Sequence, residues 1–445
     1  MKYNEVNLTK GPITRSLIIF SIPMILGNLL QQLYNIVDTL IVGRTIGATA
    51  LSAVGSSYAL MTLLTSIILG LCMGSGVVFA QYYGANEKHK LLNSIYNAFI
   101  FIMIFSVILN IIAYLLLPYI IAWLNIPDNV IKMTKDYLMV IFSGILFVSL
   151  YNFFCAILRS LGNTVIPLCF LAISAITNII LDLVCIIIFH MGVSGAALAT
   201  VISEMLSAIL IMIYFFTSMK DYWPNKEDRT FNREVVGLIL NNSILTAIQQ
   251  SIMNFGILMV QGLVNSFGYV TSAAFAVGVK IDAFAYMPAQ DFGNAFATYV
   301  AQNYGAKNKE RINKGYRTAL TISSLFCVIV AMIVNLFASE LMRIFITKPS
   351  VVSIGVEYLH IEGTFYIGIG ILFLLYALYR GLGKPFMSIV LTVISLGLRV
   401  LLAYILSSYI GQIGIWWSVP IGWAIADAFG IIYFIFKKNK IYAFK

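Results

Sequence analysis

The sequence predicts an all-α integral membrane protein with twelve transmembrane helices. Three observations lead to this fold class: 60% of the residues are hydrophobic, only 10% are charged, and the apolar residues gather in twelve runs long enough to cross a bilayer. Lipid offers no hydrogen-bond partner to backbone groups, and the runs lack the alternation of barrel strands. Each run is therefore expected to form a helix.

The expected spans follow one another with short connections. In chain order they cover residues 14–41, 49–80, 91–117, 132–158, 165–190, 194–219, 235–264, 270–300, 313–340, 353–379, 385–408 and 413–436. The longest clearly polar stretch separates the sixth span from the seventh. We therefore predict an N-terminal six-helix bundle (1–217), a cytoplasmic linker (218–234) and a C-terminal six-helix bundle (235–445).

The distribution of basic residues predicts the orientation. The net charge is +10, and 21 of the 28 Lys and Arg residues lie in the two tails, in every second loop or in the span ends next to these, against five in the alternate loops and the span ends next to those. This asymmetry is the positive-inside pattern, so both termini are expected in the cytoplasm and the protein in the plasma (inner) membrane. The basic excess then reflects topology and contact with lipid headgroups, and we expect no nucleic-acid partner.

The chain repeats itself at nearly one offset. The segment Ala-Gln-Tyr-Tyr-Gly-Ala at 80–85 recurs as Ala-Gln-Asn-Tyr-Gly-Ala at 301–306, and Arg159-Ser-Leu-Gly recurs at the same offset as Arg380-Gly-Leu-Gly. Six spans per copy give both copies the same orientation, with a pseudo-twofold axis along the membrane normal. Parallel repeats of this kind are typical of transporters whose substrate site lies between the halves.

Acidic residues inside the apolar runs are the strongest functional candidates. Asp38 lies in the first span, where a carboxylate costs roughly 2.5–3.5 kcal/mol on insertion scales. Asn178 and Asp182 are one helical turn apart and so share one helix face, and Thr200 lies on the next span. Such oxygen ligands suit Na⁺, and two carboxylates in a dry site suit one shared proton. The alternative is a structural role, such as capping a helix or pairing with a buried cation.

Several motifs together resemble one known family, the MATE (multidrug and toxic compound extrusion) antiporters. The resemblance runs from about residue 10 to 436 and rests on Gly11-Pro-Ile, Ser21-Ile-Pro23, the stretch from Gln31 to Asp38 with Gly43, Gln81-Tyr-Tyr-Gly-Ala, Arg159-Ser-Leu-Gly-Asn-Thr, Asn178-Ile-Ile-Leu-Asp182, Gly192-x-x-Gly195-Ala-Ala-x-Ala199-Thr200 and Gln302-Asn-Tyr-Gly-Ala. It implies two six-helix bundles around a central cavity. It also implies export of cationic, lipophilic compounds in exchange for H⁺ or Na⁺.

The resemblance assigns roles to individual residues. It places the coupling ion in the N-terminal half, at Asp38, Asn178, Asp182 and Thr200, and these would also be the metal ligands if the ion is Na⁺. Glu204 is a departure, because the family often has Gln there, and it is a candidate third acid.

The same resemblance indicates cavity-lining and gating residues. The cavity-lining candidates are Gln31, Tyr34, Tyr137 and Asn152, and the alternative for each is ordinary helix packing. Pro23 is a candidate gating residue that bends the first span, with a static kink as the alternative. Asp282, Asp291 and Asp427 remain without an assigned role.

Other functions fit the sequence less well. A lipid-linked sugar flippase of the related superfamily would favour a strongly cationic cavity, whereas few basic residues, Lys280 and Arg399, lie away from the ends of the predicted spans. An intramembrane enzyme needs a nucleophile–base or metal-ligand set, and the three histidines form no such motif. The internal duplication and the asymmetric acids disfavour a channel. We expect a monomeric transporter without a cofactor other than its coupling ion.

Overall fold

The computed structural model describes residues 6–123 and 128–442, and these residues are helical almost throughout. The helices of the first part of the chain are α1 (Ile13–Thr45), α2 (Ala48–Gly84), α3 (Lys88–Trp123), α4 (Asp128–Ser143), α5 (Ile145–Ser160), α6 (Val165–Leu183), the π-helical turn η1 (Val184–Ile188) and α7 (Gly192–Ser218). Two short 3₁₀ turns follow, η2 (Lys220–Tyr222) and η3 (Lys226–Asp228). The remaining helices are α8 (Arg233–Ser266), α9 (Tyr269–Gly305), α10 (Lys309–Leu336), α11 (Ala338–Phe345), α12 (Pro349–Thr364), α13 (Tyr366–Gly381), α14 (Pro385–Ile410) and α15 (Gln412–Ile441).

The predicted number of membrane spans is confirmed within the described ranges. Ten helices are long and apolar enough to cross a bilayer, and two bent pairs bring the total to twelve. The fourth span is α4 and α5 with a 43° bend, and the tenth is α12 and α13 with a 50° bend. At each bend the backbone tightens to an i→i−3 hydrogen bond, from Gly144 to Ile141 (2.9 Å) and from Phe365 to Glu362 (3.0 Å). The apolar runs over 132–158 and 353–379 predict one uninterrupted helix each, and the two bends correct this prediction.

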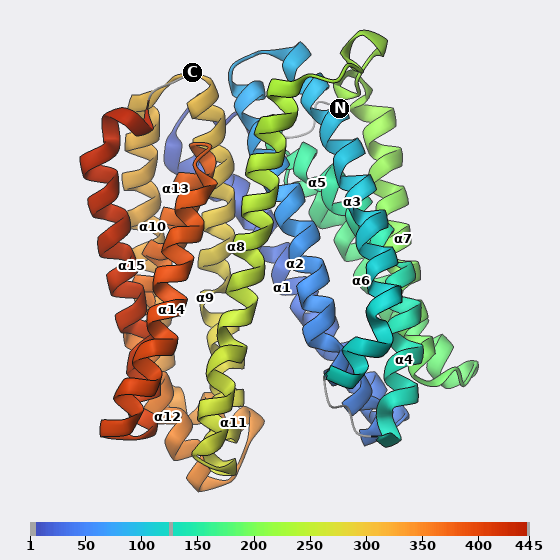
Figure 1. Ribbon diagram of the computed structural model, residues 1–445, viewed down its shortest axis with the longest axis vertical. Coiled ribbons are helices and arrows are strands. Elements are labelled where there is room, and N and C mark those ends of the chain that lie inside the picture. The colour runs from blue at the N-terminus through green and yellow to red at the C-terminus, as the bar shows by residue number, and fades with distance from the viewer. Residues whose placement is uncertain (1–5, 124–127, 443–445) are drawn as a thin grey trace. The chain divides into compact units, whose positions relative to one another are not determined.

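The chain forms two compact units, coloured along the sequence in Figure 1. One unit comprises residues 26–83 and 87–247, and the other comprises 6–25, 84–86 and 248–442. Their boundary therefore passes within α1 and within α8. The predicted division into 1–217, 218–234 and 235–445 stays a prediction.

The polar segment between α7 and α8 is docked on the first unit. Trp223 packs against a cluster of rings, with Phe216 at 5.1 Å and Phe99 at 5.6 Å between centroids. The amide of Asn93 on α3 donates to the carbonyls of Asp228 and Thr230, both at 2.8 Å. These contacts satisfy backbone groups that a free tether would leave to water.

The second unit is built around its own aromatic core. Trp416 of α15 is fully buried, stacked on Phe275 at 5.6 Å and edge-on to Tyr358 at 5.0 Å. The segment before α1 is held in the same unit, because the guanidinium of Arg311 donates to the carbonyls of Leu8, Lys10 and Gly11. In Figure 1 the helices of this unit run alongside one another as a bundle.

Matching helix ends show the repeat in the backbone. The turns after α2 and α9 each contain a residue with positive φ, Asn86 at 58° and Lys307 at 54°, and these two residues are equivalent in the repeat. The turns after α5 and α13 do the same with Gly162 at 93° and Gly383 at 69°, which are separated by the same offset. Each turn is closed by an i→i−5 backbone hydrogen bond, as in a Schellman motif.

Many large apolar side chains cover the outer surface of the helices. Leu115 of α3 and Leu336 of α10 are 68% and 76% exposed, and similar residues lie along most spans. Such surfaces are unfavourable in water and favourable in lipid, so they fit a protein surrounded by a bilayer.

Candidate functional site

Asp38 and Asp182 meet in the first unit. Asp38 lies in the second half of α1 and Asp182 in the last turn of α6, and α1 approaches α6 at Gly27, where an added Cβ would touch Leu171 at 3.5 Å. The two carboxyl groups lie within hydrogen-bonding range of each other. Such a bond requires a proton on one of them. The side chain of Asp182 has no exposed surface.

The acids and their neighbour have acceptor atoms without donors. In the described part of the chain, no donor reaches Oδ1 of Asp38, either oxygen of Asp182 or Oδ1 of Asn178, although all four atoms are buried. A buried acceptor without a partner costs about 1–3 kcal/mol, and more when it is charged. A bound cation would remove that cost, so the site is suited to a proton or a small metal ion.

Asn178 and Thr200 complete the predicted set. The Asn178 amide is directed at Thr200 Oγ1 at 3.4 Å, a long hydrogen bond, and Thr200 donates to the carbonyl of Ala196 at 3.1 Å. Nearby, Ser174 of α6 donates to the carbonyl of Ser203 of α7 at 2.8 Å. The structure thus brings the four proposed ion-coupling residues together on α1, α6 and α7.

A π-helical turn begins at Val184, two residues after Asp182. In η1 the Phe189 amide donates to the carbonyl of Val184 at 3.0 Å, an i→i−5 bond, and the Met191 amide reaches Cys185 at 3.0 Å. Single π turns are rare and often lie at functional sites. This turn could not be predicted from the sequence, because the apolar run through it shows no sign of a changed helical period.

Glu204 lies beside the same cluster. Its Oε2 would be 2.9 Å from a Cβ placed on Gly144, at the bend between α4 and α5. The carboxyl group is also within electrostatic range of Tyr34 and Tyr137. The structure therefore brings a third acid near the predicted pair.

Of the remaining predicted residues, some lie near the acids and others do not. Tyr34 lies beside Gln31, and the buried Tyr137 lies within electrostatic range of Asp38 and Asp182. The Asn152 amide instead donates to the carbonyl of Val148 at 2.8 Å, within its own helix. Pro23 lies in the first half of α1, which belongs to the second unit, and the helix continues through it.

A second acid pair occurs in the second unit. Asp282 of α9 accepts hydrogen bonds from the hydroxyls of Tyr358 and Tyr366, and Glu362 lies within hydrogen-bonding range of it. Arg399 is the nearby cation. These hydrogen bonds connect α9 with α12 and α13. Because Asp282 accepts from two donors, this acid pair differs from Asp38 and Asp182, whose buried oxygens receive none in the described ranges. Sequence spacing does not pair Asp282 with Glu362, since they lie on helices that are not consecutive in the chain.

Comparison with known proteins identifies the family. The sequence profile of the MatE family matches the chain twice, over residues 23–184 and 243–405, which confirms the duplication. The chain belongs to the MATE family. Related proteins include a probable multidrug resistance protein, YpnP, of Bacillus subtilis (29% identity; 98% of this chain, 97% of the relative). The probable multidrug resistance protein NorM of Thermotoga maritima shares 29% identity over 91% of this chain and 88% of its own.

Solved MATE structures share the fold. A MATE protein in the straight conformation superposes with a TM-score of 0.90, and one in the bent conformation with 0.91, each at 23% identity over 99% of both chains. This MATE protein is therefore a multi-pass membrane transporter with the two-lobe fold that the sequence predicted, and its relatives include proteins named for multidrug resistance and export.

Proposed function

We propose that this protein is an antiporter that exports cationic, lipophilic organic compounds in exchange for H⁺ or Na⁺. The observation that carries the proposal is the buried pair of Asp38 and Asp182, whose acceptor atoms have no donors in the described ranges. The names of related multidrug resistance and export proteins support organic compounds as the cargo and export as the direction, and the positive-inside pattern supports an orientation with both termini in the cytoplasm.

In this proposal, Asp38 and Asp182 bind a cation between them, and the cation is stable there only when α1 and α6 lie close together. A proton held between the two carboxyl groups removes one negative charge and bridges α1 to α6. A sodium ion would in addition use the free oxygen of Asn178. Ion binding then favours one of two helix arrangements, and substrate binding favours the other.

Removal of Asp38 tests the proposal. In sealed vesicles with separately imposed H⁺ and Na⁺ gradients, Asp38→Asn and Asp182→Asn should each lower gradient-driven uptake of a fluorescent cation at least about tenfold, since an amide takes up no proton and supplies no negative charge to hold a cation. Asp136→Asn, an exposed acid on α4, is the matched control and should transport normally. Full gradient-driven uptake by Asp38→Asn would overturn the proposal, and the effective gradient identifies the ion.

A further inference from the structure

The first helix of each repeat begins in one compact unit and ends in the other. Residues 13–25 of α1 belong to the second unit and residues 26–45 to the first. The reverse holds for α8, where residues 233–247 belong to the first unit and residues 248–266 to the second. Each repeat therefore sends the start of its first helix into the unit that the other repeat forms, and the helix backbone connects the two.

The start of α1 is fixed in the second unit by the residues that precede it. Leu8 is fully buried in the core of that unit, as is Phe20 of α1 itself. The guanidinium of Arg311 on α10 donates to three carbonyls ahead of the helix, those of Leu8, Lys10 and Gly11, at 2.8–3.1 Å. Hydrogen bonds from a charged donor are stronger than those between neutral groups, and the planar guanidinium fixes their directions. These bonds therefore anchor the start of α1.

The side chain of Arg311 is itself held in place. Its guanidinium carbon lies 5.7 Å from the centre of the Tyr299 ring, and the Tyr299 hydroxyl donates to the carbonyl of Arg311 at 2.9 Å. One turn further along α9, Asn303 adds a hydrogen bond of 3.1 Å to the carbonyl of Leu8. Within residues 6–123 and 128–442 no carboxylate forms an ion pair with Arg311. Its charge therefore serves the carbonyls ahead of α1.

The segment before α8 is fixed to the first unit by different side chains. Asn93 of α3 donates to two carbonyls of that segment, both at 2.8 Å. Lys90, at the position equivalent to Arg311, instead forms an ion pair of 2.7 Å with a glutamate three residues earlier. The helix that follows has Met259 where α1 has Asp38. The two anchors are thus alike in position, but only the anchor at Arg311 holds a helix that carries an acid of the proposed ion site.

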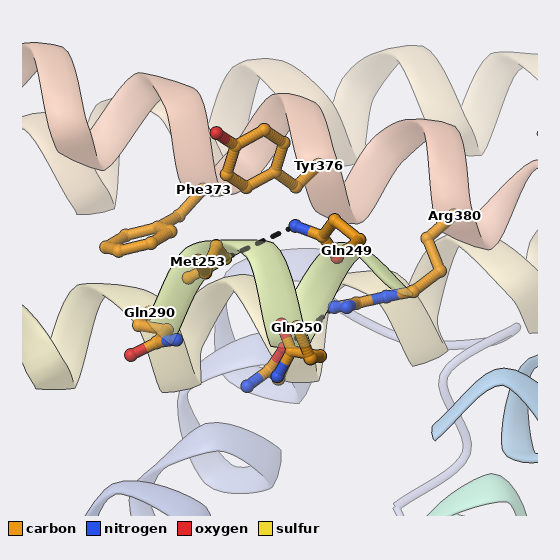
Figure 2. Close-up of a pocket in the computed structure, with 8 residues that line it drawn as sticks. Gln249, Gln250, Met253, Gln290, Phe373, Tyr376 and Arg380 are labelled. Carbon is orange, nitrogen blue, oxygen red and sulfur yellow. Dashed lines mark hydrogen bonds between the residues drawn. The ribbon is translucent and has the colours of Figure 1, made fainter. Parts of the chain in front are cut away.

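Arg380, also in the second unit, contacts only helix segments of that unit. Its guanidinium donates to Asn294 of α9 at 2.7 Å and lies beside Gln249 and Gln250 of α8 (Figure 2). The hollow around these groups has room for about one water molecule, so it offers no space for a larger ligand. Arg380 therefore connects helices within one unit, whereas Arg311 holds a helix whose other half lies in the first unit.

We propose that Arg311 is a positioning residue for ion coupling, because it fixes the start of α1 in the second unit and so transmits ion binding at Asp38 to that unit. The inference rests on the proposed function and extends it. In that function, the second half of α1 is attached to α6 only while a cation lies between Asp38 and Asp182. The first half is attached permanently. When the anchor is released, the start of α1 yields, and ion binding no longer changes the second unit.

Arg311→Gln tests the inference in the full-length protein. Binding of ethidium, a lipophilic cation, is measured by fluorescence polarisation in nanodiscs, with and without the coupling ion. In the wild type the ion should weaken ethidium binding by about fivefold or more, within the usual range of coupling between two sites. In Arg311→Gln that factor should fall below about twofold, while ethidium affinity without the ion stays the same.

Thermal melting shows whether the ion still binds. A ligand that binds only the folded state raises the melting temperature. Arg311→Gln should keep the ion-dependent part of the rise that Asp38→Asn removes, because the ion site itself is intact. A merely structural role of Arg311 would change melting and ethidium affinity and leave the ion dependence of binding as it is.

Two further variants separate the anchor from general stability. Leu8→Ala loosens the same anchor from the other side, by shortening a fully buried side chain, and should lower the ion dependence in the same way. Asn93→Ala is the matched control, since it loosens the equivalent anchor before α8. It should lower the melting temperature and keep the full ion dependence of ethidium binding.

Three results would overturn the inference. The first is full ion dependence of ethidium binding in both Arg311→Gln and Leu8→Ala. The second is an equal loss of ion dependence in Asn93→Ala, and the third is loss of the ion-dependent melting shift in Arg311→Gln. Failure of the proposed function would appear in the wild type instead, as ethidium binding and melting that depend on neither H⁺ nor Na⁺.

Discussion

At the scale of single residues, the two buried acid pairs differ in the hydrogen bonds that they receive. In the first unit, Oδ1 of Asp38 and both oxygens of Asp182 are buried without a donor among the described residues, whereas Asp282 in the second unit accepts hydrogen bonds from two tyrosines. An ionised carboxylate without a donor or a counterion is costly in a medium of low polarity. We propose that a mobile cation removes this cost at Asp38 and Asp182.

Gly144 tests how tightly Glu204 is held. A methyl group on Gly144 would lie 2.9 Å from Glu204 Oε2 and 3.1 Å from Val201 Cγ2. The carboxyl group ends a flexible side chain and can shift, so Gly144→Ala should lower the free energy of unfolding by only about 1 kcal/mol through overpacking. Thermal melting of the purified protein measures the loss.

The double variant Gly144→Ala with Glu204→Ala provides the control. Removing the carboxyl group frees part of the space, so the double variant should recover part of the stability, and the coupling is obtained from the double-mutant cycle. Strict additivity of the two changes would show that Glu204 does not lie against Gly144.

At the scale of helices, close packing depends on a few small residues. A Cβ on Gly74 of α2 would overlap the backbone of Asn242 in the first part of α8, and Gly70 approaches Ala247 in the same way. Within the first unit, these glycines allow α2 and α8 to pack backbone against backbone, as small residues do in membrane bundles.

Gly74→Ala should therefore destabilise the protein by roughly 1–3 kcal/mol, because two backbones must move apart. Gly55→Ala is the control on the same helix: within the described ranges nothing lies within 4 Å of an added Cβ there, so it should be neutral or slightly stabilising. Melting temperatures of the two variants in detergent give the comparison. Equal melting temperatures would mean that α2 and α8 lie farther apart than described.

Substitution of Pro23 tests whether α1 changes its shape during transport. Pro23→Ala should fold normally, since Pro costs about 3 kcal/mol relative to Ala inside a helix. If the bend at Pro23 serves gating, export of a fluorescent cation from loaded vesicles should fall severalfold while binding of the dye persists. Normal export by this variant would leave Pro23 as a static kink.

At the scale of the whole molecule, the two repeats share a backbone pattern but differ in the polar residues at equivalent positions. Helix ends still match between the repeats, yet the positions equivalent to Asp38, Asn178 and Asp182 at the same offset hold Met259, Arg399 and Ala403. Ion coupling is therefore proposed for the first repeat only. In such a transporter, ion binding at Asp38 and Asp182 must change the affinity for the substrate.

Linkage predicts reciprocal effects. If the coupling ion weakens binding of a dye by some factor, the dye must weaken binding of the ion by the same factor. Dye affinity measured across a series of pH or Na⁺ concentrations should therefore fall as the coupling ion saturates its site, by about fivefold or more. Asp38→Asn should make the affinity independent of the ion. An unchanged ion dependence in this variant would place coupling elsewhere, with the acid pair at Asp282 and Glu362 as the next candidate.

The sequence by itself determined the fold class, the number of spans and the duplication, because lipid imposes the same demand on every segment: an apolar run must satisfy its own backbone as a helix. It also placed Asn178 beside Asp182, since an i, i+4 spacing brings two side chains to one helix face. It did not reveal the bends at Gly144 and Phe365 or the π turn after Asp182, because local hydrophobicity does not change there.

Only the tertiary structure decided which distant polar groups meet. Asp38 on α1 reaches Asp182 on α6, Asp282 on α9 reaches Glu362 on α12, and Arg380 comes to lie among the amides of α8 and α9 without a carboxylate in the described ranges. These meetings depend on how whole helices pack, and helix packing is set by many weak contacts spread over the chain rather than by the spacing of any motif.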